Sequence, residues 1–337
     1  MAFDWDVDLT SGFEARFLAN ISKTPGTERF GGCDTPEMGK RLREGGFDAV
    51  LVMGWHLKAF WQAIWAAKRA GLPVMVRGDS HLDTPRSLAK RLIKAFVYPP
   101  ALRVFDAALY VGARNRAYYE HYRFPPDRLV FAPHCVDTGW FAERATDKAR
   151  RALRSRLGIG LDTKLVLFAG KLQAFKKPMH VVEAVAHLRS KRDDVHILVA
   201  GSGELGDAVE RRAREAGVPV YMLGFQNQSE MPAVYAAADV LVLPSTGRET
   251  WGLVANEALA CGTPVVLSDA VGAAPDLAGD GVAGRVFPVG DIGALAYAIG
   301  EMISVPPSAG AIKARSRQYS LSACCDGIEE AMRRLRG

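Results

Sequence analysis

Short apolar segments of strand length alternate with segments of helix length along most of this chain, and this alternation limits the fold more than any other feature. The predicted strands are residues 49–53, 73–77, 107–111, 129–132, 164–169, 196–200, 220–223, 240–243, 264–267 and 284–287. The predicted helices are residues 60–70, 85–97, 115–122, 147–157, 178–191, 205–216, 230–237, 253–260, 292–303 and 322–336. Continuous apolar strands separated by helices are typical of a parallel sheet covered on both faces. The sequence therefore predicts an α/β fold.

The strands form two series, which predicts two facing, doubly wound Rossmann-like domains. We place an N-terminal domain at residues 1–140, a C-terminal domain at 141–310, and a final helical segment at 311–337 that can pack back on the N-terminal domain. Pro306 and Pro307 break the chain before that segment. The first predicted strand begins only near Ala49, so roughly one βαβ unit, about 30 residues, is missing from the front of the first series.

Composition limits the class of protein. Of the 337 residues, 49% are hydrophobic and 24% are charged, which is typical of globular proteins. No apolar segment approaches the roughly 18 residues of a membrane-spanning helix. Asp4, Asp6 and Asp8 do not fit a secretory signal, so we expect a cytoplasmic protein. The net charge of +6 suits anionic small molecules or surfaces, and it is too small to indicate a nucleic-acid partner.

Neither the cysteines nor the acidic residues predict a metal site. The five cysteines have no CxxC or Cys/His spacing, so the sequence predicts neither a zinc site nor a disulfide framework. Asp4 and Asp6 match the Asp-x-Asp pattern of cation-binding loops, but they precede any predicted strand. We therefore predict no metal site.

The segment at residues 241–269 carries the most chemical information. A strand ends at Pro244, a Ser/Thr/Gly loop follows, and a helix begins after Gly252. A loop of this kind, at the carboxyl end of a strand and before a helix, is where doubly wound folds bind anions. Glu249 in the loop and Glu257 in the helix could accept hydrogen bonds from hydroxyls on both sides of a diphosphate. Alternatively, Glu249 is a helix-capping acid and Glu257 lies on a solvated face.

Two further loops follow predicted strands. Gly170 and Lys171 follow the strand at 164–169, and Lys176 lies just before the next helix. Two cations at such a junction can neutralise diphosphate oxygens as negative charge grows on a leaving group, although they could equally be solvated loop lysines. In the other loop, Gly201 and Gly203 allow close backbone approach.

Taken together, these motifs resemble the retaining glycosyltransferases of the "group 1" (family 4) type. The matching pattern comprises Gly170-Lys171, Lys176-Lys177-Pro178, Ala200-Gly201-Ser202-Gly203, Leu223-Gly224-Phe225, Glu249 and Glu257 with seven residues between them, and Gly262-Thr263-Pro264. The resemblance covers nearly all of residues 160–300, and it is looser in the front half. It implies the GT-B architecture and a nucleotide-sugar donor, linked to UDP or GDP, that is a substrate rather than a cofactor.

The resemblance also implies roles for individual residues. Lys171 and Lys176 would hold the donor diphosphate, although Lys171 replaces the family's more frequent Arg. Glu257 would bind the ribose hydroxyls, and Glu249 would bind the donor sugar. The remaining residues would complete the donor site, with Ser245, Gly252 and Leu253 around the phosphates, Gly170, Gly201 and Gly203 in the neighbouring loops, Phe225 against the base, and His81 at the donor–acceptor junction. We expect His81, Glu249 and Lys176 to act in catalysis, while a purely structural role for His81 stays open.

The implied reaction is metal-independent sugar transfer with retention at the anomeric carbon. The acceptor would be a glycan, lipid-linked or small, and polysaccharide synthesis is the expected setting. The short front puts activity in question more than fold. Two alternatives therefore stay open: a nucleotide-sugar-binding remnant without transferase activity, and a nucleotide-sugar 2-epimerase.

The segment at residues 85–97 predicts a basic amphipathic helix. Thr84 would be its N-cap and Pro85 its first residue. The segment from Arg86 to Arg103 holds five cations and no acid, and Leu88, Leu92, Ile93 and Phe96 form an apolar stripe. Such a helix can bind the inner face of a membrane, or its stripe can pack on the sheet while the lysines face water.

Overall fold

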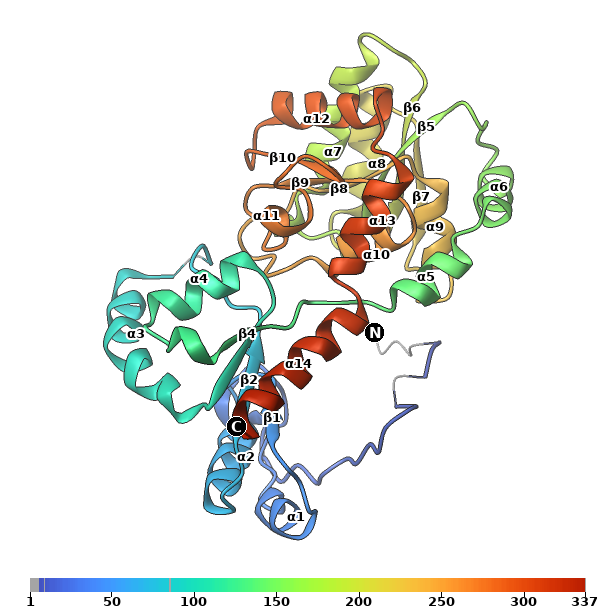
Figure 1. The fold of residues 1–337 in the computed structure, drawn as a ribbon. Helices are drawn as coiled ribbons and strands as arrows, with labels where there is room; N and C mark the ends of the chain where they lie inside the picture. Colours follow the sequence, from blue (N-terminus) through green and yellow to red (C-terminus); the bar gives the residue numbers. More distant parts are fainter. Residues whose placement is uncertain (1–5, 9, 85, 337) are drawn as a thin grey trace. The chain divides into compact units, whose positions relative to one another are not determined.

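The structure is a computed structural model that describes residues 6–8, 10–84 and 86–336. It divides into two compact units (Figure 1). The C-terminal unit consists mainly of residues 134–323, and the N-terminal unit consists mainly of residues 10–82, 86–133 and 324–336. Each unit holds one parallel sheet, so the predicted α/β class with two Rossmann-like sheets is confirmed.

The N-terminal unit contains a four-stranded sheet in the order β1-β2-β3-β4. Its strands are β1 (Val50–Val52), β2 (Val74–Gly78), β3 (Ala107–Tyr110) and β4 (Leu129–Phe131), close to the four predicted for this half. Its helices are α1 (Met38–Glu44), α2 (Lys58–Arg69), α3 (Leu88–Ala101), α4 (Ala113–His121) and most of α14 (Leu321–Arg336), with single 3₁₀ turns η1 (Phe30–Gly32), η2 (Leu102–Val104) and η3 (Pro126–Arg128). The helix α14 packs closely on β4, because a Cβ at Gly327 would lie 2.1 Å from the carbonyl oxygen of Phe131.

The predicted start of the basic helix is wrong. The helix α3 begins at Leu88, and its N-cap is Ser87, whose hydroxyl accepts a hydrogen bond from the Lys90 N–H at 3.5 Å. Serine is a strong N-cap residue, and it lies closer to the apolar stripe than Thr84 does. Pro85, predicted as the first helical residue, lies outside the described residues.

The C-terminal unit contains a six-stranded parallel sheet in the order β10-β9-β8-β5-β6-β7. Its strands are β5 (Lys164–Ala169), β6 (Val195–Ala200), β7 (Val220–Gly224), β8 (Val240–Leu243), β9 (Val265–Ser268) and β10 (Gly284–Phe287). Every residue of β8 and β9 is buried, which explains why these strands appear in the sequence as continuous apolar runs.

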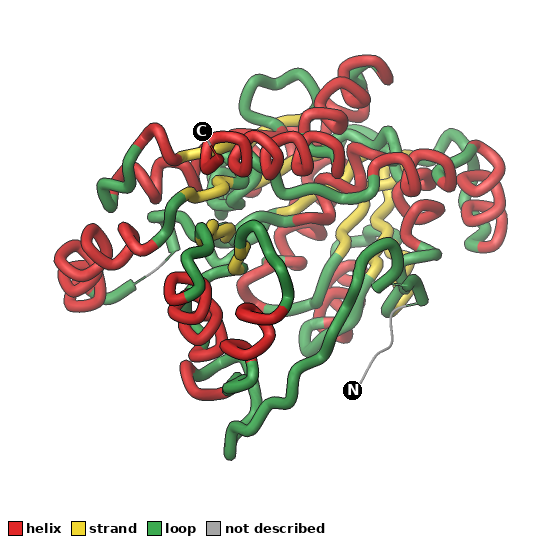
Figure 2. Tube along the Cα trace, turned by 60° about the horizontal axis from the view of Figure 1, so that its bottom comes forward, coloured by secondary structure: helices red, strands yellow, loops and turns green. Residues whose placement is uncertain are grey.

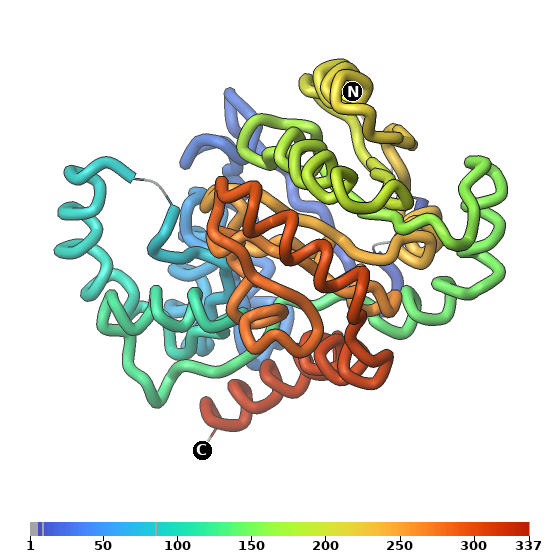
Figure 3. The backbone as a smooth tube through the Cα atoms, turned by 90° about the horizontal axis from the view of Figure 1, so that it is seen from above, coloured from blue at the N-terminus to red at the C-terminus, as the bar shows by residue number. Residues whose placement is uncertain are grey.

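Helices surround this sheet (Figure 2). They are α5 (Thr138–Arg144), α6 (Asp147–Arg156), α7 (Pro178–Arg189), α8 (Gly206–Glu215), α9 (Met231–Ala237), α10 (Leu253–Ala260), α11 (Ala274–Leu277), α12 (Ile292–Ser304) and α13 (Ala309–Gln318), with one 3₁₀ turn, η4 (Ala174–Lys176). The helices α7 and α12 lie side by side, and Gly300 of α12 packs against Leu188 of α7 (Figure 3). Apolar side chains of α7, α8 and α12 and of the strands form one core.

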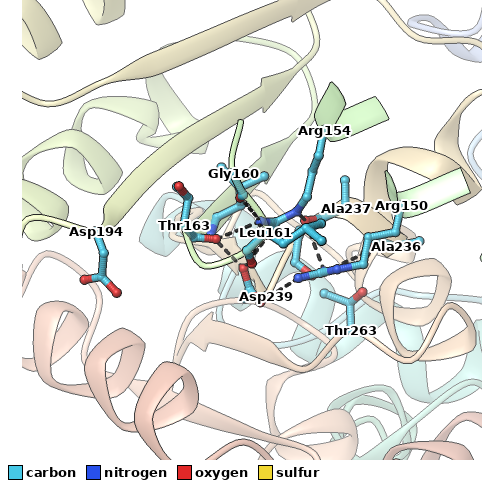
Figure 4. A network of polar contacts seen from close by, with 12 residues as sticks. Arg150, Arg154, Gly160, Leu161, Thr163, Asp194, Ala236, Ala237, Asp239 and Thr263 are labelled. Carbon is cyan, nitrogen blue, oxygen red and sulfur yellow. Dashed lines mark hydrogen bonds and ion pairs between the residues drawn. The ribbon is translucent and has the colours of Figure 1, made fainter. Parts of the chain in front are cut away.

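A buried arginine fixes α6 to the sheet (Figure 4). Arg154 is fully buried, and its guanidinium donates to Asp239 at 2.8 Å and to the Ala237 carbonyl at 2.9 Å. Three more carbonyls, those of Gly160, Leu161 and Thr163, accept from its Nη1. The neighbouring Arg150 also pairs with Asp239, at 3.2 Å. Because a buried charge is costly unless it is fully paired, this network holds α6 at the amino ends of β5 and β8.

Candidate functional site

The functional side chains are positioned by a change of direction in the six-stranded sheet. β5 pairs with β6 on one side and with β8 on the other. The chain therefore builds outward from β5 to β7 and then returns to begin the other half at β8. In doubly wound sheets, ligands bind at such a point, beyond the carboxyl ends of the strands. The loops that follow β5 and β8 start at this point.

Lys176 and Glu249 meet at this carboxyl edge. The Nζ of Lys176, in the loop after β5, forms an ion pair with Oε2 of Glu249, in the loop after β8. The two side chains are only 15% and 14% exposed. The buried hydroxyl of Ser245 also donates to Glu249 Oε2, at 3.2 Å. Lys176 and Glu249, which are 73 positions apart in the sequence, therefore form one site.

Contacts with the loop after β8 hold the loop that carries Lys176. The N–H of Thr246 donates to the Phe175 carbonyl at 2.9 Å, and the Arg248 guanidinium lies 5.0 Å from the centre of the Phe175 ring. Lys177 adopts a left-handed conformation, with φ of 54°, directly before Pro178. A non-glycine residue in that region costs about 1–3 kcal/mol, and such strain often accompanies functional loops.

The glycines of the neighbouring loops pack those loops against each other. A Cβ at Gly201 would lie 2.0 Å from the Gly170 carbonyl oxygen, and a Cβ at Gly203 would lie 2.6 Å from the Leu172 carbonyl oxygen. The Gly170 N–H donates to the Ala200 carbonyl at 2.9 Å. The close backbone approach predicted for Gly201 and Gly203 is therefore made between the loops after β5 and β6.

The loop after β8 leads into the N-terminus of α10. Gly252 is the N-cap residue, with φ of 100°, and a Cβ there would lie 2.6 Å from Leu243 Cδ2. The first helical residue, Leu253, is 41% exposed. The N-cap residue has no side chain that could cap the helix, and Glu249 Oε2 is engaged by Lys176 and Ser245 instead. The first amides of a helix are free of intrahelical partners and favour an anion.

Glu257 lies on α10 in a largely apolar environment. Its Oε2 accepts a hydrogen bond of 2.5 Å from the hydroxyl of Tyr235, which is fully buried on α9. Burial raises the pKa of Glu257 to about 7, and the Tyr235 hydrogen bond only partly opposes this shift. Glu257 therefore does not belong to a solvated helix face.

The predicted residues not yet described are Lys171, Phe225 and His81. Lys171 is exposed and directly follows Gly170 at the end of β5. Phe225 is 51% exposed at the end of β7, two strands from β5 in the same sheet. His81 belongs to the N-terminal unit, where it follows β2 and is 1% exposed. Its carbonyl accepts from the Arg86 guanidinium at 3.4 Å.

Three residues of the site were missed from the sequence. Tyr235, Arg248 and the buried Trp251, whose indole N–H donates to Asn256 Oδ1 at 2.8 Å, carried no recognisable signal. Tyr235 lies in an apolar helical segment and resembles an ordinary core residue. Only the spatial neighbourhood of α9 and α10 shows that its hydroxyl reaches Glu257.

Metal-ligand clusters and membrane spans are both absent from the described part of the chain. Among residues 6–8, 10–84 and 86–336, no group of three or more His, Cys, Asp or Glu is arranged to hold a metal ion. Within the same ranges, no helix combines the length and the apolarity needed to cross a bilayer. Of the Asp-x-Asp segment, Asp4 and Trp5 lie outside the described residues, and Asp6 accepts a hydrogen bond from the Ser229 N–H at 3.2 Å.

Comparison with solved structures identifies the architecture. Anabaena HepE in complex with UDP superposes with a TM-score of 0.73 and 20% identity, over 88% of this chain and 82% of that chain. Its fold is the GT-B fold of glycosyltransferases, so the predicted GT-B architecture is confirmed.

Curated relatives match a part of their own length. D-inositol 3-phosphate glycosyltransferase of Corynebacterium aurimucosum is 34% identical over 245 residues, which are 69% of this chain and 56% of that protein. A GDP-mannose-dependent alpha-(1-6)-phosphatidylinositol monomannoside mannosyltransferase of Mycolicibacterium smegmatis is 30% identical, over 64% of this chain and 58% of that protein. The chain thus spans little more than half the length of these relatives.

A family model covers the unit that carries the site. The model described as "Glycosyl transferases group 1" matches residues 149–319, just over half of the chain. That range includes β5, β8, the Lys176–Glu249 pair and Glu257. By this match and by its architecture, the chain belongs to the group 1 glycosyl transferases.

Proposed function

We propose that the protein transfers a sugar from a UDP- or GDP-linked donor to a hydroxyl acceptor, with retention at the anomeric carbon and without a divalent cation. The observation that carries this proposal is the Lys176–Glu249 pair at the point where the sheet changes direction, beside the uncapped N-terminus of α10. That arrangement offers positive charge and free amides to a diphosphate, and a carboxylate to sugar hydroxyls.

In this proposal the donor lies along the carboxyl edge of the six-stranded sheet. Lys171, Lys176 and the amides of Gly252 and Leu253 bind the diphosphate. Glu257 accepts hydrogen bonds from the ribose, and Phe225 lies against the base. Ser245 acts on Glu249, because its buried hydroxyl already donates to that carboxylate. Gly170, Gly201 and Gly203 keep the adjoining loops in place.

The reaction breaks the bond between the anomeric carbon and the diphosphate oxygen, and the electron pair leaves with the diphosphate. Lys176 stabilises the charge that develops on this leaving group, since a preformed cation is most effective in a site that excludes water. The acceptor hydroxyl then bonds to the anomeric carbon from the same face and loses its proton to the departing phosphate oxygen. Glu249 orients the sugar, and His81 serves at the donor–acceptor junction.

The names of two relatives support a proposal for the acceptor. The name of one refers to inositol 3-phosphate, and the name of another refers to a phosphatidylinositol mannoside. These names support a small polyol or lipid-linked glycan as acceptor, and we expect no nucleic-acid partner.

A donor screen followed by a product assay tests the proposal. Calorimetry with UDP, GDP and their hexose conjugates should show one preferred nucleotide. With that donor and a phosphoinositol acceptor, chelator-treated protein should form a product whose anomeric configuration, read by NMR, equals that of the donor. An inverted product, or activity that returns only with magnesium or manganese, would contradict it. Donor binding without transfer or hydrolysis would indicate a binding remnant, and isomerisation without acceptor would indicate an epimerase.

We further propose that α3 binds the inner face of an anionic membrane. None of its residues is buried. Leu88, Phe96 and Val97 are 69%, 80% and 51% exposed, so the predicted apolar stripe does not pack on the sheet. Lys90 and Arg91 are also exposed, whereas Lys94 turns inward and donates to Tyr118. Apolar side chains beside cations favour an anionic bilayer surface, at about 1 kcal/mol for each cation near it.

Liposome co-sedimentation tests this contact. Binding should increase with anionic lipid, decrease with salt, and fall in K90E/R91E and in F96S. The variant R211E/R214E, which makes the same charge change on exposed α8, should bind as the unaltered protein does. Equal losses in both charge variants would mean that only net charge matters.

A further inference from the structure

A groove in the N-terminal unit lies outside the site described above. It has a volume of about 450 Å³ and runs between α1 and α2, which lie side by side (Figure 1). The two helices approach closely because small residues face each other, with Ala66 Cβ only 3.9 Å from the position of a Cβ at Gly39. Pockets of about 300–1,000 Å³ are the usual size for small ligands.

Aromatic rings form one wall of the groove. Trp61 and Trp65 lie one helical turn apart on α2, with ring centres 6.1 Å apart and planes tilted by 32°. The indole N–H of Trp61 donates to the Trp55 carbonyl at 2.9 Å, which fixes that ring. Trp65 is 51% exposed, and Phe30, which also lines the groove, is 56% exposed. Large aromatic rings held open to solvent are costly unless a ligand or partner covers them.

Two arginines also line the groove. Arg43 of α1 and Arg69 of α2 both line it, and both are exposed. Within the described ranges of the chain, neither guanidinium forms an ion pair with a carboxylate. Each of them can therefore donate two parallel hydrogen bonds to a carboxylate or phosphate.

A polar network involves two lining residues of the groove, Lys58 and Gln62. Lys58 pairs with Asp34 at 2.6 Å, and the amide of Gln62 donates to the other oxygen of Asp34 at 2.8 Å. The Thr35 N–H donates to the Gln62 carbonyl at 2.9 Å. Both carboxylate oxygens of Asp34 are thus engaged, so this acid does not cancel the charge of Arg43 and Arg69.

We propose that the groove between α1 and α2 binds a saccharide that carries a carboxylate or phosphate group. The faces of Trp61 and Trp65 suit the C–H face of a sugar ring, because aromatic faces are negative and the C–H hydrogens of a sugar are slightly positive. Arg43 and Arg69 suit the anion. A bilayer would need a convex apolar face, whereas this surface is concave and includes residues of a polar network. The site is separate from the proposed donor site, so it can be tested without reference to transfer.

Calorimetry on the full chain tests this binding with four probes: a uronic acid tetrasaccharide, a neutral tetrasaccharide, glucose 6-phosphate and inorganic sulfate. The uronic acid tetrasaccharide should bind and change tryptophan fluorescence. Binding of glucose 6-phosphate as well would indicate that one anionic sugar suffices, and its absence would indicate that a glycan chain is needed. Loss of one charge-assisted hydrogen bond reduces affinity by about tenfold or more. R43Q and R69Q should therefore each reduce the affinity for the uronic acid tetrasaccharide by that factor.

Matched variants separate stacking, charge and folding. W65A should reduce the affinity for the uronic acid tetrasaccharide by at least the same factor, and W65F should largely restore that affinity. R41Q, on α1 but outside the groove, should leave binding unchanged. The proposal fails if no saccharide binds, if the neutral and anionic tetrasaccharides bind equally, if sulfate alone accounts for the binding, or if W65A instead removes binding to anionic vesicles. Nucleoside diphosphate binding should be unaltered in every variant.

Discussion

At the scale of single residues, Glu257 makes the stability of the protein depend on pH. Its pKa in the folded state, about 7, lies above its ordinary value of 4.5. Between these values the folded state holds the proton more tightly than the unfolded state. Stability is therefore lost as the pH rises from 4.5 to 7, and the loss is complete above pH 7.

The variant E257Q cannot ionise and should escape this loss. We expect it to gain about 1–2 kcal/mol relative to the unaltered protein between pH 5 and pH 8, after allowance for partial exposure of the carboxyl group. Urea unfolding at both pH values measures the difference. Y235F, which removes the hydrogen bond that favours the charged form, should enlarge the loss. Parallel pH profiles for E257Q and the unaltered protein would contradict the environment described for Glu257.

Lys176 and Glu249 should behave as a coupled pair. K176M leaves the Glu249 carboxylate without its cation, and E249Q leaves the Lys176 ammonium group without its anion. Each variant should therefore lower the free energy of unfolding by about 1–3 kcal/mol. The double variant should cost less than their sum, with a coupling of about 1–2 kcal/mol in a denaturant-based cycle. The exposed pair of Arg116 and Glu120 is the control, with an expected coupling of about 0.3–0.5 kcal/mol. K176M should also reduce the affinity for UDP or GDP more than the affinity for the free nucleoside.

Residue spacing in the sequence was enough to select these two side chains but not their environment. Glu249 and Glu257 stood out because they flank a predicted helix start, and Lys176 because it follows a predicted strand. Their ion pair and hydrogen bonds depend on which strands are neighbours in the sheet. A one-dimensional pattern contains no such information, which is why Tyr235 was missed.

At the scale of elements, the loops after β5 and β6 depend on glycine. G201A should destabilise the protein by about 2–4 kcal/mol, because its Cβ would overlap the Gly170 carbonyl and its φ of 144° is unfavourable for alanine. G217A is the control, since φ is 65° there and nothing lies within 4 Å of the added Cβ. It should cost about 1 kcal/mol. Thermal unfolding distinguishes the two, and similar losses would show that the loop packing is not tight.

Strands were easier to predict than helices. β5 and β8 have the predicted bounds because both faces of a parallel sheet are buried there, which leaves continuous apolar runs, and the edge strand β10 has its predicted bounds as well. The helices α1, α5, α11 and α13 were not predicted, and α3 begins three residues late. Short helices such as α5 depend on tertiary packing more than on their own sequence.

At the scale of the whole molecule, two separate cores should give two unfolding transitions. One core surrounds Ile64 and Tyr119 in the N-terminal unit, and the other surrounds Val166 and Ile299 in the C-terminal unit. Chains with more than one core often depart from two-state unfolding. The sequence indicated this division through its two series of strands.

Scanning calorimetry can assign each transition. R154M should lower the stability of the C-terminal unit only, by about 3–5 kcal/mol, because it removes a buried donor from Asp239 and from the Ala237 carbonyl. I64A should lower the stability of the N-terminal unit only, by about 2–5 kcal/mol. A nucleoside diphosphate should raise the transition that R154M lowers. A single transition that both variants shift would contradict independent unfolding.

The interlocked loops after β5 and β6 also bear on protein engineering. Gly170, Gly201 and Gly203 contact one another's loops through backbone atoms, so a library randomised there would mostly sample misfolded chains. Phe225 and Leu253 lie at the same edge with side chains open to solvent, and substitution there leaves the backbone packing untouched. Attempts to change the nucleotide sugar that the proposed donor site binds should therefore start from these two positions.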